Sequence, residues 1–205
     1  MLVPETARRR SVFTGVVFAY VGVGALALAA AWALGVNPLE TSAWLGTSGV
    51  AAATMSAGFG AMIAVATIAA TRVLLRRAAW ARTLHADLRP VVRDQGDGTL
   101  VFMALASGIG EELLFRGLLV PLAGVFVSAA LFGIVHQVRG PARWGWMAWA
   151  TLMGLLFALL FRFTGSLVGP ILAHVAINAA NLRVLRDVDP APRPRRALGG
   201  ILGRA

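Results

Sequence analysis

The stretch TLVFMALASGIGEELLFRGLLV, residues 99–120, decides the fold of this chain. It is apolar or small throughout except for Glu111, Glu112 and Arg116 and the weakly polar Thr99 and Ser107. An α-helix needs about 20 predominantly apolar residues to cross the roughly 30 Å hydrocarbon layer of a bilayer. The stretch therefore predicts a transmembrane helix that carries three charged side chains inside the membrane.

Five further stretches around it share this length and apolar character. They are residues 11–37, 42–71, 121–138, 144–161 and 166–182. The chain is 58% hydrophobic and only 14% charged, whereas soluble domains contain about 25% charged residues. We therefore expect an all-α, polytopic membrane bundle of about six transmembrane helices. Pro121 and Gly124 leave almost no loop between the third and the fourth helix.

The arginines orient these spans. The chain has 19 basic and 9 acidic residues, and every basic residue is an arginine. Of these, 17 lie on one side of the predicted spans, Arg162 lies on the other side, and Arg116 lies within a span. The positive-inside rule then places both termini in the cytoplasm, and this distribution argues against a nucleic-acid-binding surface.

The chain divides into three predicted segments. Residues 1–98 hold two transmembrane helices and a basic cytoplasmic or interfacial loop, residues 99–182 form a four-helix catalytic core, and residues 183–205 form a flexible basic tail. In the loop, Trp80, Leu84 and Leu88 recur every four residues, which predicts a short helix that lies on anionic lipid headgroups and ends at Pro90. A plain solvated linker is the alternative.

The acidic residues inside the core are informative because a membrane-embedded carboxylate is costly, by about 2.5–3.5 kcal/mol on insertion scales. Glu111 and Glu112 are the only acidic residues between Gly98 and Arg186. Glu112 precedes Arg116 by four residues, the favourable order for an ion pair on one helix face. Glu111 points in another direction and has no cation on its own helix, so its partners must come from other helices.

The polar groups available to Glu111 are His136, His174 and Asn178. His174 and Asn178 lie one turn apart and share a helix face. A carboxylate can act as a general base on water with a histidine beside it, while a second histidine and an amide stabilise the oxyanion formed at a carbonyl. The set suits hydrolysis of a peptide bond, and cysteine chemistry is excluded because the chain has no cysteine.

Three motifs give these residues a family resemblance. EELLFR at 111–116 matches EExxxR, FGIVH at 132–136 matches FxxxH, and HVAIN at 174–178 matches HxxxN. In this order, each in a predicted span, they resemble the type II CAAX-processing proteases and their bacterial relatives, the CPBP (Abi) intramembrane glutamic endopeptidases. The resemblance covers residues 99–182.

The resemblance implies a catalytic and a supporting set of side chains. The catalytic set comprises Glu111 as the base, His136 as its partner in activating water, and His174 and Asn178 as the groups that stabilise the oxyanion. The supporting set comprises Glu112, Arg116 and Phe132. No cofactor is implied, although a divalent metal stays open because one carboxylate and two histidines can bind such an ion.

The implied substrate is a membrane-associated peptide or protein, and the partners are this substrate and the lipid bilayer. The all-arginine, alanine-rich composition is typical of a GC-rich bacterial gene, so we expect the bacterial cytoplasmic (inner) membrane. Two other function classes stay open. Intramembrane Glu and His also build the proton relays of transporters, and buried polar groups also hold helices together in non-catalytic scaffolds or immunity proteins.

Overall fold

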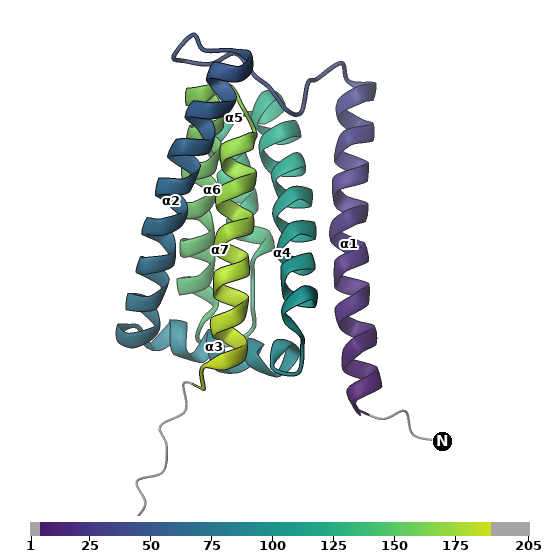
Figure 1. Ribbon diagram of the computed structural model, residues 1–205, viewed down its shortest axis with the longest axis vertical. Helices are drawn as coiled ribbons and strands as arrows, with labels where there is room; N and C mark the ends of the chain where they lie inside the picture. The colour runs from purple at the N-terminus through teal and green to yellow at the C-terminus, as the bar shows by residue number, and fades with distance from the viewer. Residues whose placement is uncertain (1–4, 190–205) are drawn as a thin grey trace, which may run out of the picture.

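The computed structural model describes residues 5–189, and the side chains of residues 14–189. In this part of the chain the structure is a bundle of helices without a β-strand (Figure 1). The elements are α1 (Glu5–Ala33), α2 (Gly49–Arg77), α3 (Ala79–Val92), α4 (Asp97–Glu112), the π-helical η1 (Leu113–Leu119), α5 (Val120–Val135), α6 (Arg143–Thr164) and α7 (Val168–Asp187). The prediction of an all-α bundle is confirmed.

Five helical stretches of the described chain are long and apolar enough to cross a membrane, rather than six. The difference lies in Asp97–Val135, a 39-residue stretch that contains both the third and the fourth predicted span. The chain turns at Gly124, whose φ of 85° is accessible mainly to glycine. The part of α5 after this turn has only 11 residues, or about 16 Å, and so reaches only about halfway through a bilayer.

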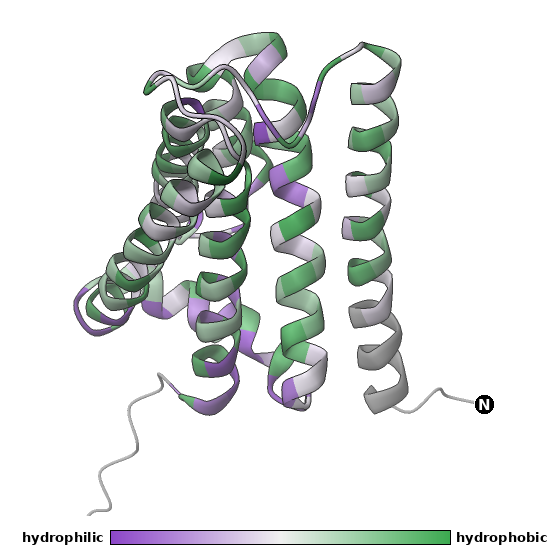
Figure 2. Cartoon of the chain, turned by 45° about the horizontal axis from the view of Figure 1, so that its top comes forward, coloured by the Kyte–Doolittle hydropathy of each residue, from purple (hydrophilic) through white to green (hydrophobic). Residues whose placement is uncertain are grey.

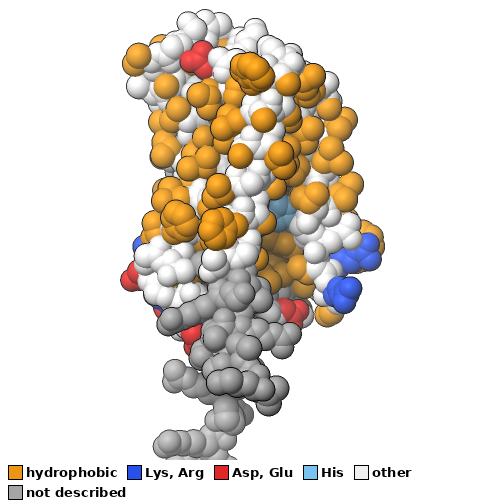
Figure 3. Space-filling model, turned by 90° about the vertical axis from the view of Figure 1, so that its right-hand side faces the viewer, with side chains coloured by type: hydrophobic (Ala, Val, Ile, Leu, Met, Phe, Trp, Pro, Cys, Tyr) orange, Lys and Arg blue, Asp and Glu red, His pale blue; other side chains and the backbone are white. Residues whose placement is uncertain are grey.

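The two ends of the bundle differ in polarity. The start of α1, the end of α7 and the crossing helix α3 lie at one end (Figure 1). Hydrophilic residues gather at this end, whereas the helices are hydrophobic along their length (Figure 2). Figure 3 shows hydrophobic side chains over most of the height of the α1 face, with charged groups mainly at its lower edge. The protein is an integral membrane protein by these features, and we call the α3 end the arginine-rich end.

Helix α3 forms as the spacing of its apolar residues predicts, but its predicted end at Pro90 is wrong. The helix continues to Val92. The apolar side chains of Trp80, Leu84 and Leu88 line a cavity of the bundle. The indole of Trp80 packs directly against Gly145 of α6, where a Cβ atom would collide with it.

Helix α7 continues to Asp187, five residues into the segment predicted to be a flexible tail. Two ion pairs accompany the extension. Arg186 lies 2.7 Å from the Asp97 carboxylate and Arg183 lies 3.9 Å from it, so the end of α7 is tied to the start of α4. Residues 190–205 of the predicted tail lie outside the described residues.

Small residues allow the helices to approach closely, as is usual in membranes. Gly60 of α2 and Gly169 of α7 face each other so closely that a Cβ on either would collide with backbone. Ser56 accepts a hydrogen bond from the Gly169 N–H at 2.9 Å and donates one to the Ser166 carbonyl at 2.8 Å. On the other side of the core, Gly24 of α1 packs against Gly110 of α4. These contacts fix α1 and α7 around the segment that contains the two glutamates.

Candidate active site

The glutamates and histidines lie at the same depth in the bundle. Glu111 is 14 residues from the start of α4, and His174 is 13 residues from the end of α7. At about 1.5 Å per residue, both lie about 20 Å from the arginine-rich end. His136 reaches this depth from the opposite direction, because it caps the short α5 that follows the turn at Gly124.

Glu112 and Arg116 form the ion pair that their spacing predicts. Arg116 Nη1 lies 2.8 Å from Glu112 Oε1, and both side chains are fully buried. Arg116 Nη2 also donates to the Gly154 carbonyl at 3.2 Å, and the guanidinium stacks 4.3 Å from the centre of the Phe132 ring. The π-helical turn η1 begins directly after Glu112, a type of helical irregularity that is frequent at functional sites.

Glu112 has a second partner that the sequence does not indicate. His174 Nδ1 lies 2.7 Å from Glu112 Oε1, the same oxygen that Arg116 contacts. Since an ionised carboxylate only accepts, Nδ1 carries the proton of this bond and Nε2 is left to face the other way. Glu112 therefore orients His174 as well as neutralising Arg116. The register that allows this contact depends on Gly108, which packs directly against Val175 of α7.

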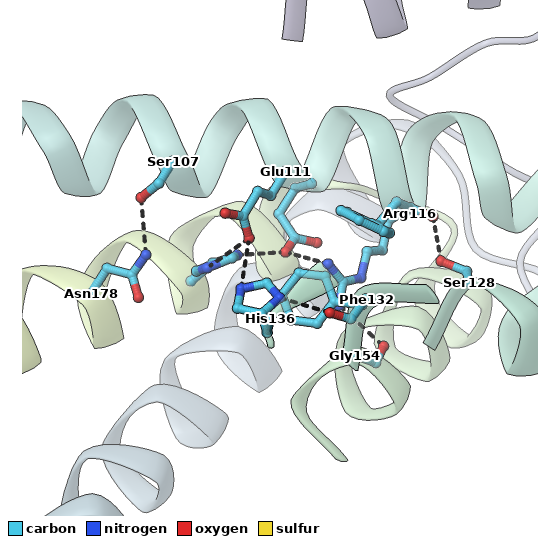
Figure 4. Close-up of polar contacts among 11 residues, drawn as sticks. Ser107, Glu111, Arg116, Ser128, Phe132, His136, Gly154 and Asn178 are labelled. Carbon is cyan, nitrogen blue, oxygen red and sulfur yellow. Dashed lines mark hydrogen bonds and ion pairs between the residues drawn. The ribbon is translucent and has the colours of Figure 1, made fainter. Parts of the chain in front are cut away.

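Glu111 is near both histidines, and Figure 4 shows its carboxylate pointing toward His136. Its Oε2 atom is 3.6 Å from His136 Nε2 and 3.7 Å from His174 Nε2. His136 is oriented in the same manner as His174, because its Nδ1 lies 2.7 Å from the Phe132 carbonyl and donates to it. Both imidazoles thus turn Nε2 toward one carboxylate oxygen. Phe132 contributes twice, through its carbonyl to His136 and through its ring to Arg116.

Asn178 lines the same cavity, but its hydrogen bond goes elsewhere. Its Nδ2 donates to Ser107 Oγ at 3.0 Å (Figure 4). Ser107 lies one turn before Glu111 on α4 and was not among the predicted site residues. Its spacing of four from Glu111, within an otherwise apolar span, is a signal that could have found it.

Tyr20 of α1 is a second residue absent from the sequence prediction. It is the single tyrosine of the chain, it lines the cavity together with Glu111, and its hydroxyl interacts with the Glu111 carboxylate. Gly110 makes this approach possible, since a Cβ there would collide with the Tyr20 carbonyl. No motif in α1 marks the residue, so only the packing of α1 on α4 reveals it.

These side chains open onto one cavity of about 410 Å³. The cavity runs from Glu111 toward the arginine-rich end, where residues of α3 line it. Its volume is typical of ligand pockets, which measure about 300–1,000 Å³. Apart from Glu111 and the histidines, its wall near the site is aromatic and aliphatic, with Trp149, Met153 and Phe157 of α6.

The glutamates and histidines of the site are also of the residue types that bind metal ions. Over residues 5–189, no group of three or more His, Cys, Asp or Glu side chains is arranged to hold a metal ion. Two of the Nδ1 atoms are engaged by protein acceptors, and only the Nε2 atoms turn toward Glu111. The arrangement offers hydrogen-bond and proton chemistry at Glu111.

Comparisons with known proteins find similarity over the segment that holds this site. Residues 98–180 match the family model of the type II CAAX prenyl endopeptidase Rce1-like proteins. The chain is also similar to the uncharacterized protein YpbD of Bacillus subtilis (strain 168), with 31% identity over 80 residues. This match covers 39% of the chain and 42% of that protein, so it spans less than half the length of this relative. No solved structure matches the chain. The matched segment holds all three motifs of the site, and over this segment the chain is similar to the Rce1-like type II CAAX prenyl endopeptidases.

Proposed function

We propose that the protein is an intramembrane endopeptidase that hydrolyses a peptide bond of a membrane-associated peptide or protein. One observation carries the proposal, namely that His136 Nε2 and His174 Nε2 both face Glu111 Oε2, at 3.6 and 3.7 Å. These separations are too long for direct hydrogen bonds. A water molecule beside the three atoms could donate one hydrogen bond to Glu111 Oε2 and the other to a histidine Nε2. The match of residues 98–180 to the prenyl endopeptidase family model supports the same kind of reaction.

In the proposed reaction, this water attacks the carbonyl carbon of the scissile bond and gives one proton to Glu111. The oxyanion that forms is stabilised by hydrogen-bond donors from α7, namely His174 Nε2–H in its protonated form and the Asn178 amide. Glu111 then returns the proton to the leaving nitrogen as the carbon–nitrogen bond breaks, which yields an acid and an amine.

The charges of the site suit this proton transfer. Arg116 and Glu112 neutralise each other, so Glu111 is left with the one net charge of the cluster. Unpaired charges are costly in a dry interior. One further proton, held by His174, makes the cluster neutral and leaves Glu111 ionised to accept the proton that the water gives up. His136 assists in activating the water, while Glu112 holds His174 in place.

We place the protein in the bacterial cytoplasmic membrane, with the arginine-rich end in the cytoplasm. The cavity then connects the site to the cytoplasmic side, where α3 lies. The substrate and the lipid bilayer are the expected partners.

The test compares cells that express the wild-type protein with cells that express Glu111→Gln. This substitution preserves the shape of the side chain but removes its basicity. Protein N-termini are identified by mass spectrometry, and we expect a set of membrane-associated termini to disappear in Glu111→Gln cells. Glu40→Gln is the matched control, because Glu40 is exposed in a loop at the opposite end of the bundle.

Two results would contradict the proposal. One is an unchanged set of termini in the Glu111→Gln cells at equal protein level. The other is a proton flux through liposomes containing the wild-type protein that Glu111→Gln abolishes, without any peptide cleavage. The second result would favour a transporter.

A further inference from the structure

The chain that joins α5 to α6, residues 137–142, contains neither helix nor strand and directly follows His136. Because α5 stops about halfway through the bundle, this segment begins at the depth of Glu111. It ends where α6 begins, close to α3, since Gly145 packs against Trp80. Non-helical backbone therefore leads from the active site toward the arginine-rich end.

The first three residues of this segment have backbone groups without a described partner. Gln137 and Arg139 are exposed, and Val138 is half-buried. Among residues 5–189, no hydrogen bond joins the N–H or C=O group of any of the three to another residue. Non-helical backbone at membrane depth is tolerated where it is buried in protein or lines a water-filled space. These exposed groups therefore need water or another chain as their partner.

The local sequence is typical of a short edge strand. Polar Gln137, apolar Val138 and polar Arg139 alternate, and the apolar member is the least exposed of the three. Gly140 ends this stretch with a φ of 91°, a conformation that favours glycine, and its carbonyl accepts from the Arg143 N–H at 3.2 Å. A short edge with unpaired N–H and C=O groups is a template for pairing with another chain.

The position of this edge relates it to the active site. Gln137 is bonded to His136, whose Nε2 lies 3.6 Å from Glu111 Oε2. The His136 side chain is 20% exposed, against 8% for Glu111 and 9% for His174, so the site is most open where the edge begins. A chain paired with the edge would lie about 4.8 Å from it and could continue past Glu111.

The chemistry of the edge favours an extended peptide as its occupant. Such a peptide offers N–H and C=O groups along its whole length, whereas a lipid acyl chain offers none. A helical peptide uses its own carbonyls in internal hydrogen bonds, so its scissile carbonyl is engaged until the helix opens. An extended peptide leaves this carbonyl free for the attack of water.

We propose that residues 137–139 bind the substrate as an added β-strand, which leads the scissile bond to Glu111. This inference rests on the proposed endopeptidase function. Affinity in this mode comes from main-chain hydrogen bonds, so the edge accepts peptides of varied sequence. Alternate residues of a strand turn their N–H and C=O groups to the same side. The substrate therefore pairs either with Val138 or with both Gln137 and Arg139.

The test measures binding, and the full chain carries Glu111→Gln so that no peptide is cleaved. The probe is hexaalanine with an N-lauroyl group and a C-terminal amide. Its comparison compound is the same peptide with every backbone nitrogen methylated, which has no backbone N–H to donate. Binding is followed by tryptophan fluorescence, since the Trp146 ring lies 5.8 Å from the His136 ring. We expect the methylated peptide to bind at least about tenfold more weakly, because it loses several hydrogen bonds.

Backbone esters then locate the hydrogen bonds in the protein. Lactic acid is the ester analogue of alanine, so its incorporation at position 137, 138 or 139 removes one N–H group. The matched controls are Gln137→Ala, Val138→Ala and Arg139→Ala. We expect the probe to bind about fivefold more weakly either to the ester at 138 alone or to the esters at 137 and 139 alone. The unfolding midpoint should equal that of the alanine control, because no described residue accepts from these N–H groups.

The inference is overturned if the two peptides bind alike to the Glu111→Gln protein. It is also overturned if the three esters weaken binding equally or have no effect, because residues 137–139 would then only connect α5 to α6. The binding result is independent of cleavage. An alternating loss without any cleavage by the wild-type protein would refute the endopeptidase and leave the strand site, while cleavage without the alternation would do the reverse.

Discussion

Replacement of Arg116 by methionine isolates the contribution of charge to the stability of the site. The side chain is fully buried, pairs with Glu112 at 2.8 Å and stacks on the Phe132 ring. Methionine fills much of the same space, so Arg116→Met removes the charge with little cavity. Removal of one partner of a buried ion pair costs about 3–5 kcal/mol, because the other charge is left uncompensated. We expect the free energy of unfolding to fall by this amount.

The double variant Glu112→Gln/Arg116→Met provides the internal comparison. It removes both charges, while the glutamine oxygen still accepts from His174 Nδ1. We expect it to regain at least about 2 kcal/mol relative to Arg116→Met, because no uncompensated charge is left. Unfolding is measured by circular dichroism during titration of mixed micelles with a denaturing detergent. Arg76→Met is the control, and an exposed substitution of this kind should stay within about 0.5 kcal/mol of the wild type.

Two outcomes would refute this reasoning. Arg116→Met as stable as the wild type would show that Glu112 does not depend on the guanidinium. A double variant less stable than Arg116→Met would show that the two charges are not coupled as proposed, since coupled charges give a double variant that loses less stability than the sum of the two single losses.

Three further predictions concern other parts of the account. Tyr20→Phe removes the hydroxyl that interacts with Glu111 and should lower kcat about tenfold while KM stays the same, measured with a substrate found by the terminus comparison; an unchanged kcat would make the contact incidental. Gly124→Ala forces a side chain into a conformation with φ of 85° and should destabilise the bundle by about 1–3 kcal/mol in the same unfolding titration, whereas no loss would mean that the turn relaxes freely. Cleavage should persist after exhaustive treatment with a chelator, because Glu111 itself moves the proton in the proposed reaction; inactivation that added zinc reverses would require a metal.

The sequence indicated much of the site because charges in apolar spans are costly and therefore conspicuous. Glu111, Glu112 and Arg116 stand out in residues 99–120, and the spacing of the latter two predicts their ion pair, which the structure contains. Pro121 and Gly124 also indicated a tight boundary between the third and fourth predicted spans, and the chain turns at Gly124. The sequence did not predict the short α5 after this turn, because the average hydropathy of a span does not show where its helix ends.

The contacts that could not be predicted from the sequence all join different helices. The bond between Glu112 and His174 depends on the register of α4 and α7, which the approach of Gly108 to Val175 determines. Tyr20 reaches Glu111 only because Gly110 lets α1 come close. The register between two helices depends on how their small residues pack in three dimensions. The spacing of these small residues along the chain does not show which residue of another helix each of them contacts.

The most direct test of the central claim is the rate at which the purified protein in liposomes cleaves a substrate identified in cells. If Glu111 is the base, Glu111→Gln should lower this rate at least about a hundredfold, the smallest contribution usual for general acid–base catalysis, while the unfolding midpoint stays at the wild-type value. A Glu111→Gln protein that still cleaves at more than about a tenth of the wild-type rate would contradict the claim.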